Sequence, residues 1–205
     1  MLQWCSSALW RRIVKTSLPV LVLCCLVASL SACAQTGQVV TLKPGQDLFE
    51  SSDGEGREVA VRVVNEMEDV VLGRLENRRG EHAVITTDRD PVKVMTEATR
   101  EALRSKGFQP VVWSEDAART LTVRIRRIEH VVTGNAPRKV DTRVELAFEA
   151  GNDGRSLTGT ARAGRSDTTL TRPTAERNGI WISEALDSGL DRLLGERLRE
   201  FLTNP

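Results

Sequence analysis

The sequence contains few of the residues on which metal and nucleophile chemistry depends. It has no tyrosine, two histidines, four cysteines, four phenylalanines and four tryptophans among its 205 residues. A surface of stacked aromatic rings, as in many proteins that bind sugars or single-stranded nucleic acid, is therefore not expected. Lys and Arg number 29 and Asp and Glu 28, so the net charge of +1 excludes a strongly basic protein that neutralises many phosphates.

An apolar run of thirteen residues, 18–30, lies near the N-terminus. It follows three basic residues, Arg11, Arg12 and Lys15, and no acidic residue precedes it. A basic segment followed by a short apolar segment is typical of a secretory signal. Because a helix of thirteen residues is too short to cross about 30 Å of hydrocarbon, we do not expect a transmembrane anchor.

Small residues end this run at positions 30–33 (Leu-Ser-Ala-Cys), which resemble the lipobox of bacterial lipoproteins. In such signals the cysteine thiol receives a diacylglyceryl group and the chain is cut before the cysteine. The sequence therefore predicts a signal peptide over residues 1–32 and a lipid anchor on Cys33; an unlipidated secreted protein cut nearby is the alternative. Residue 34 is Ala rather than Asp, which by resemblance to sorted lipoproteins favours the outer membrane, with the protein facing the periplasm.

Lipidation and cleavage leave a mature chain without a free thiol. Cys5, Cys24 and Cys25 lie in the predicted signal, and Cys33 carries the lipid. The 173 mature residues therefore form no disulfide, and a hydrophobic core has to stabilise them. Loss of the three basic residues of the signal leaves 26 bases against 28 acids, a net charge of −2. This balance argues against nucleic acid as a partner.

The mature chain is predicted to hold a tether and one domain. Residues 33–57 are rich in Gly, Pro, Ser and charge, which indicates a lipidated tether, with 39–42 as a candidate edge strand. Residues 58–205 are predicted to form a single periplasmic domain. Residues 65–80 fit either a short helix or a loop. Strand patterns cover 58–64, 82–87 and 108–112.

A more regular pattern follows in the second half of the domain. Alternating apolar and polar residues predict three antiparallel strands joined by turns, at 120–128, 140–150 and 156–164. The alternation breaks at Arg127-Ile128, which we interpret as a bulge. Two amphipathic helices are expected, one from Asp90-Pro91 to Lys106-Gly107 and one over about 174–202.

These patterns predict an α+β protein. Each helix has one apolar face, and the sheet is apolar on one side only. The simplest packing has two layers, a mostly antiparallel sheet with two amphipathic helices packed on one of its faces.

No known catalytic or metal-binding motif is found in the sequence. His82 and His130 stand in no His/Cys cluster or HExxH motif, so we expect both to be surface or half-buried residues. Asp88 and Asp90 precede a helix, which makes Asp90 an N-cap rather than a cation ligand. We therefore predict no metal, no cofactor and no enzymatic activity.

The polar side of the predicted sheet is the candidate binding surface. Neighbouring strands would place residues of opposite charge close together there. They are Arg124, Arg126, Arg143, Glu145, Glu149 and Arg162. Two interpretations fit this arrangement, a solvated lattice of ion pairs or a docking surface for a protein partner in the cell envelope.

The order of these segments resembles the YajG family of bacterial lipoproteins. The shared features are a lipobox, a polar tether, a Val-rich strand, a loop ending near Leu72-Gly73, a strand before Asp88, a helix ending at Gly107-Phe108, a charged antiparallel meander and a C-terminal helix. Family members often have Asp and Arg after the first strand, where this chain has Asn65–Asp69. The resemblance implies a periplasm-facing lipoprotein with no established catalytic activity and no known cofactor.

Two functions follow as hypotheses. The first is a non-enzymatic adaptor anchored in the outer membrane, because the layout is also similar to lipoproteins that assist lipopolysaccharide assembly and lipid-transport ABC systems. The second is a carrier of a lipid or cell-wall ligand, in a groove that the small residues of 157–163 would leave beneath the helices.

Replacing Cys33 by Ser is expected to prevent lipidation, because only the thiol accepts the diacylglyceryl group. The variant should lose its acyl chains and its place in the outer-membrane fraction, since those chains supply the membrane affinity. Mass spectrometry of the N-terminal peptide and membrane fractionation measure the two effects. A Cys33→Ser protein that still carries acyl chains would contradict the predicted anchor.

Overall fold

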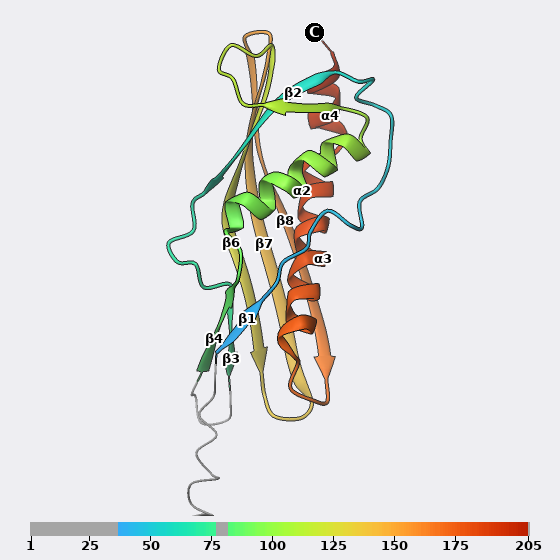
Figure 1. The fold of residues 1–205 in the computed structure, drawn as a ribbon. Helices are drawn as coiled ribbons and strands as arrows, with labels where there is room; N and C mark the ends of the chain where they lie inside the picture. The colour runs from blue at the N-terminus through green and yellow to red at the C-terminus, as the bar shows by residue number, and fades with distance from the viewer. Residues whose placement is uncertain (1–36, 77–81, 205) are drawn as a thin grey trace, which may run out of the picture. The chain divides into compact units, whose positions relative to one another are not determined.

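A computed structural model describes residues 37–76 and 82–204 (Figure 1). The predicted signal peptide and Cys33 lie outside the described residues. In chain order the described elements are β1 (Gln38–Val40), β2 (Glu58–Asn65), β3 (Gly73–Glu76), β4 (His82–Thr87), α2 (Pro91–Ser105), β5 (Gln109–Val112), β6 (Arg119–Thr133), β7 (Arg138–Asn152), β8 (Arg155–Thr169), α3 (Ala175–Leu193) and α4 (Glu196–Thr203).

Strand β6 lies at the centre of the sheet. On one side it pairs with β2 over residues 120–125 and with β3 over residues 130–132. On its other side it pairs along its length with β7, which pairs in turn with β8. Strand β5 continues the sheet beyond β2, and β4 and β1 continue it beyond β3. Most strands therefore depend on β6 directly or through one neighbour.

The predicted α+β class is confirmed, but the sheet is mixed rather than mostly antiparallel. Among the described strands, four pairings are parallel, β1–β4, β2–β5, β2–β6 and β3–β6. Three are antiparallel, β3–β4, β6–β7 and β7–β8, and the last two form the predicted meander. Alternation shows which face a strand buries but not which strand lies beside it, so the sequence pattern could not reveal the parallel pairings.

Helix α2 begins and ends where the sequence predicts. The Asp90 carboxylate accepts a hydrogen bond from the Val92 N–H at 2.9 Å, which caps the first turn. Gly107 follows the helix with φ +82°, a left-handed conformation that glycine adopts without strain. Phe108 then folds back into the core with 4% of its surface exposed.

The predicted C-terminal helix is two helices, so the described part has three helices instead of two. Helix α3 ends at Leu193, and α4 begins at Glu196 after the N-cap Gly195. No side chain caps α4. The break occurs because glycine at position 195 disfavours a continuous helix, although the apolar stripe runs on through Leu198 and Leu202, both buried.

Helices α2 and α3 contact each other and lie against one face of the sheet, with the core between the two layers (Figure 1). Small residues of β8 lie under α3, where Ala161 and Ala163 are buried. A Cβ at Gly189 of α3 would lie 3.3 Å from Leu146 Cδ1, so this helix already packs tightly on the sheet. The groove expected beside residues 157–163 is therefore filled by α3.

Residues 37–57 are packed on the domain instead of forming a tether, so the compact unit begins at Gly37 and not at residue 58. The candidate edge strand near 39–42 exists as β1, and Leu42 is fully buried. The Lys43 N–H donates to Ser183 Oγ at 2.9 Å, and the Gly45 N–H donates to Asp187 Oδ1 at 2.5 Å. These bonds tie a segment of polar composition to α3, which composition alone could not indicate.

In the described part of the chain, no helix is both long enough and apolar enough to cross a membrane.

Gly73 of β3 lies so close to β6 that a larger residue cannot fit. A Cβ at this position would lie 1.9 Å from the His130 carbonyl oxygen. We expect Gly73→Ala to lower the free energy of unfolding by at least about 1–3 kcal/mol, because β3 and β6 would have to separate. Urea denaturation measures the change.

Gly164 of β8 is the matched control for this substitution. Its Cβ would lie 3.4 Å from the Thr142 carbonyl oxygen, an ordinary contact. Gly164→Ala should change stability by less than about 0.5 kcal/mol. Equal effects of the two substitutions would show that β3 does not need this close approach.

Candidate functional site

A bulge in β6 shapes the side of the sheet that α2 and α3 leave uncovered. The pairing of β6 with β7 shifts register between Ile125 and Arg127, which confirms the bulge that the broken alternation predicts and places it at Arg126. Without the extra residue, Arg127 would point into the core. The bulge turns Arg126 and Arg127 to solvent and puts Ile128, 5% exposed, inside.

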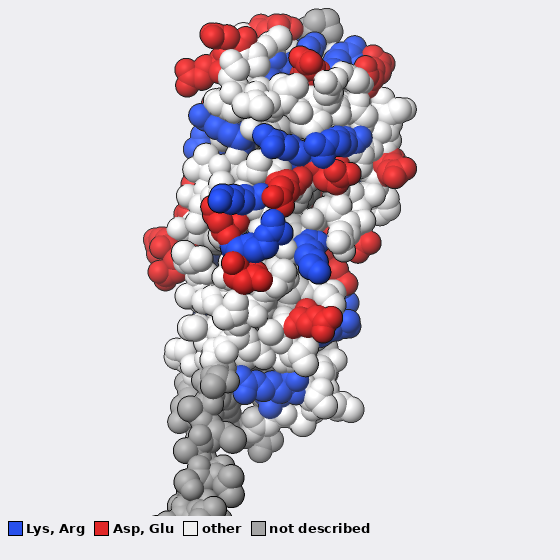
Figure 2. Space-filling model, viewed as in Figure 1, with Lys and Arg blue, Asp and Glu red and all other residues white. Residues whose placement is uncertain are grey.

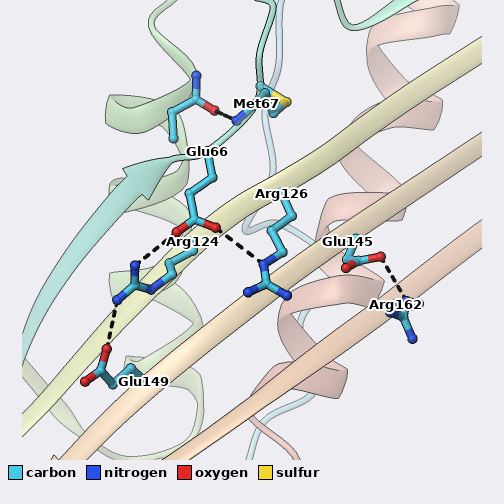
Figure 3. Close-up of polar contacts among 8 residues, drawn as sticks. Glu66, Met67, Arg124, Arg126, Glu145, Glu149 and Arg162 are labelled. Atoms are coloured by element: carbon cyan, nitrogen blue, oxygen red, sulfur yellow. Dashed lines mark hydrogen bonds and ion pairs between the residues drawn. The ribbon is translucent and has the colours of Figure 1, made fainter.

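Six residues on this side form a set of ion pairs that we call the charged face (Figure 3). They are Glu66, Arg124, Arg126, Glu145, Glu149 and Arg162. Arg124 lies between two carboxylates: its Nη1 is 3.0 Å from Glu66 Oε1, and its Nη2 is 2.8 Å from Glu149 Oε2. The other carboxylate oxygen of Glu66 is 3.4 Å from Arg126 Nε. The three side chains of Glu66, Arg124 and Glu149 thus link β6 and β7 to the residue that follows β2.

Arg162 and Glu145 form a separate pair on the neighbouring strands β8 and β7. Arg162 Nε donates to Glu145 Oε2 at 2.9 Å, and the two residues are register partners. Arg143, also predicted for this surface, lies apart from the network. Its Nη1 is 3.9 Å from Glu129 Oε2, and 69% of its side chain is exposed.

These contacts hold the charged face in its ionised form. The Arg124 guanidinium lowers the pKa of Glu66 mainly through its hydrogen bond, and Arg162 lowers the pKa of Glu145 in the same way. The pKa of Arg124 is raised in turn, first by Glu66 and then by Glu149. A carboxyl group with a lowered pKa is a poor general acid near neutral pH. Exposed ion pairs also contribute little to folding, so these groups can exchange partners at small cost.

Sequence reasoning placed Arg124, Arg126, Glu145, Glu149 and Arg162 correctly on one face but missed Glu66. This residue follows β2 within a cluster of acids that looks like an exposed loop. Its backbone N–H donates to the Ile125 carbonyl at 2.9 Å, which continues the pairing with β6 and positions the side chain over Arg124. No pattern within the segment itself signals this, because the β2–β6 pairing is parallel and distant in sequence.

His130 is fully buried, whereas the sequence led us to expect a surface or half-buried residue. Its Nε2 is 3.0 Å from Asn178 Oδ1, an atom that can only accept, so Nε2 carries the proton. Its Nδ1 is 2.8 Å from Thr142 Oγ1 and accepts from that hydroxyl. Burial lowers the pKa of His130, against a smaller opposing effect of Asn178. The sequence does contain a signal for this burial. After the bulge, the alternation of apolar and polar residues places positions 128, 130 and 132 on the core side.

The described residues offer no metal centre, since no group of three His, Cys, Asp or Glu among them lies close enough to hold an ion.

A hollow of ≈ 580 Å³ lies between α3 and the segment before β2, away from the charged face. Apolar Val39 and Ile180 and charged Lys43 and Asp187 are among its lining residues. Burial raises the pKa of Asp187, although backbone N–H groups of the loop that begins at Gly45 oppose this effect. That carboxylate holds the loop and is not free for a ligand.

On the face that Figure 2 shows, basic and acidic side chains are interspersed, and no large area has one sign. On this face the pattern does not favour a polyanionic partner.

Comparison with known proteins places the chain in a family. A family model described as "uncharacterized lipoprotein" matches residues 50–203, about three quarters of the chain. The chain belongs to this family of lipoproteins. It is the YajG-type family that the order of segments in the sequence indicates. None of the curated proteins matches this lipoprotein significantly.

Several solved structures are similar to this lipoprotein at low sequence identity. A Xanthomonas campestris protein of family DUF330 is 14% identical with a TM-score of 0.44, over 77% of this chain and 92% of that one. A minor lipoprotein from Acinetobacter baumannii is 10% identical with a TM-score of 0.37, over 72% and 94%. PelC from Paraburkholderia phytofirmans, solved as a dodecamer, is 18% identical with a TM-score of 0.32, over 70% and 94%.

Stability of this lipoprotein is expected to fall at mildly acidic pH because of His130. Its pKa is lower in the folded chain than the value of 6.5 expected when unfolded, so below that pH the unfolded chain takes up a proton that the folded chain refuses. The free energy of unfolding should then fall by up to about 1.4 kcal/mol per pH unit until the folded pKa is reached. Urea denaturation between pH 7.5 and 5, values that bracket the histidine transition, measures the slope.

His130→Gln should remove this slope while lowering stability at every pH, because it breaks a buried hydrogen-bonded site. His82→Gln, which changes the other histidine and leaves this buried site intact, is the matched control. Identical slopes in the wild type and His130→Gln would refute the assignment.

Proposed function

We propose that this lipoprotein is anchored by a lipid on Cys33 to the periplasmic side of the outer membrane and acts there as a non-enzymatic adaptor. The lipobox and membership in a lipoprotein family support the anchor. Ala34 supports the outer membrane. The charged face is the single observation that carries the adaptor role, because it is an ordered set of ion pairs on the side of the sheet that the helices do not cover.

The charged face suits a protein partner rather than a substrate. Its carboxylates are engaged by arginines and have lowered pKa values where a shift is resolved, which suits recognition better than proton transfer. Arginine is enriched at protein interfaces, where its planar group binds carboxylates through two parallel hydrogen bonds. The side chain of Arg162 is 74% exposed, and that of Arg143, which lies beside the charged face, is 69% exposed, so a partner can reach both residues. The expected partner therefore presents acidic side chains to these arginines.

The adaptor role predicts that reversing charge on this face abolishes partner capture. Arg124→Glu with Arg126→Glu would surround Glu66 and Glu149 with like charges while leaving the core untouched. We expect in vivo crosslinking of the tagged, lipidated chain to recover one dominant envelope protein, and this double variant to recover at least about tenfold less, equivalent to about 1.4 kcal/mol. Mass spectrometry of the outer-membrane fraction provides the measurement.

A matched control exists on the opposite layer. Arg89 and Arg104 are also exposed and paired with glutamates, Glu97 and Glu101, each at 2.8 Å. Arg89→Glu with Arg104→Glu makes the same change in net charge and should retain capture, whereas Cys33→Ser should lose it. Equal capture by the two double variants would exclude the charged face as the docking surface.

A further inference from the structure

The chain turns back at one end of the sheet, at two segments that we call the tip. Strand β6 ends at Thr133 and β7 begins at Arg138, where Arg138 is the register partner of Thr169 at the end of β8. The tip consists of Thr133–Lys139, which joins β6 to β7, and Leu170–Thr174, which joins β8 to α3. Figure 1 shows these connections at the end of the sheet where α3 begins.

The first described residues are fixed beside the tip. Gln38 Nε2 donates to the Pro173 carbonyl at 3.0 Å, and Asn178 Nδ2 at the start of α3 donates to Gln38 Oε1 at 2.6 Å. Position 33 precedes Gly37 by four residues, which span at most about 14 Å when fully extended. A lipid on Cys33 would therefore keep the start of β1, and the tip beside it, close to the headgroups.

The composition of the tip fits such a position. Its two segments contain three bases, Arg138, Lys139 and Arg172, and no acid. Just outside them, Asp141 Oδ2 lies 3.0 Å from Lys139 Nζ, so Lys139 would exchange this partner for a phosphate. Leu170 directly follows β8 and is 78% exposed, so its apolar side chain gains little free energy of burial in the folded domain. Bases near an anionic bilayer surface contribute about 1 kcal/mol each. A leucine exposed beside bases and polar residues would suit the boundary between headgroups and acyl chains.

We propose that the tip rests on the bilayer, with Leu170 at the boundary between headgroups and acyl chains and with Arg138, Lys139 and Arg172 among phosphates of anionic phospholipids. This inference rests on the proposed lipidation of Cys33. The lipid then fixes not only the distance of the domain from the membrane but also its orientation. Strands β6, β7 and β8 would rise from the membrane, and the charged face would be held above it.

A single fluorescent label on Leu170 tests the contact. Because the mature chain has only Cys33, which the lipid occupies, Leu170→Cys provides one reactive thiol. Val112→Cys is the matched control: Val112 is an aliphatic residue of β5, 79% exposed, on the level of Leu121 in β6. Twelve residues of β6 separate that level from Thr133, about 40 Å along the strand.

The lipidated proteins are labelled with an environment-sensitive dye and reconstituted into vesicles of phosphatidylethanolamine and phosphatidylglycerol, with or without brominated acyl chains. We expect emission from position 170 to shift to shorter wavelength and to fall at least about twofold with brominated lipid, because the dye enters the interface. Emission from position 112 should remain as in water.

Vesicle flotation separates the two ways in which the idea can fail. Protein that does not float with the vesicles overturns the lipid anchor and with it the orientation. Protein that floats while the label at 170 behaves like the label at 112 leaves the anchor intact and overturns the tip contact alone.

Discussion

The pairing of β6 with three neighbours is the constraint on which the rest of the structure depends. Its two halves bind different strands on one side, and β7 follows it on the other. One extra residue at Arg126 changes which side chains face the core after that point. The same bulge places an arginine over Glu66 and sends His130 into the interior, so the candidate surface and the buried polar network have one cause.

Local features of this fold could be predicted from the sequence, and long-range ones could not. The Asp90 cap, the glycine that ends α2 and the alternation of β6 to β8 are each encoded within a few residues. The parallel neighbours of β6 are not, because β2 and β3 meet it from positions about sixty residues earlier. Segment 37–57 was missed for a related reason: it is held by Ser183 and Asp187, far along the chain.

The same distinction between local and long-range features applies to the residues of the candidate site. Alternation was sufficient to place Arg124, Arg126, Glu145 and Arg162 on one face, since a single strand pattern fixes the side on which a residue lies. Alternation could not identify Glu66, whose position follows from the parallel pairing of β2 with β6. It also predicted Arg143 as part of the charged network, whereas the register pairs Arg143 with Glu129 instead. Residue type and face were predictable; the identity of each ion-pair partner required the register.

In the proposed orientation, the tip would set the height and direction in which the charged face meets its partner. Nine residues of β6 separate Arg124 from Thr133, so the centre of the charged face would stand about 30 Å above the tip. A domain on a long, flexible tether would sample all directions, and its partner would have to select one of them. Here Gln38 hydrogen-bonds to Asn178 of α3, which fixes the first described residues to that helix, and the predicted anchor at Cys33 lies only a few residues before them. With the proposed contact at the tip, this short connection would reduce the orientational freedom that capture otherwise removes, and it would favour partners whose acidic side chains lie at the same height in the periplasm.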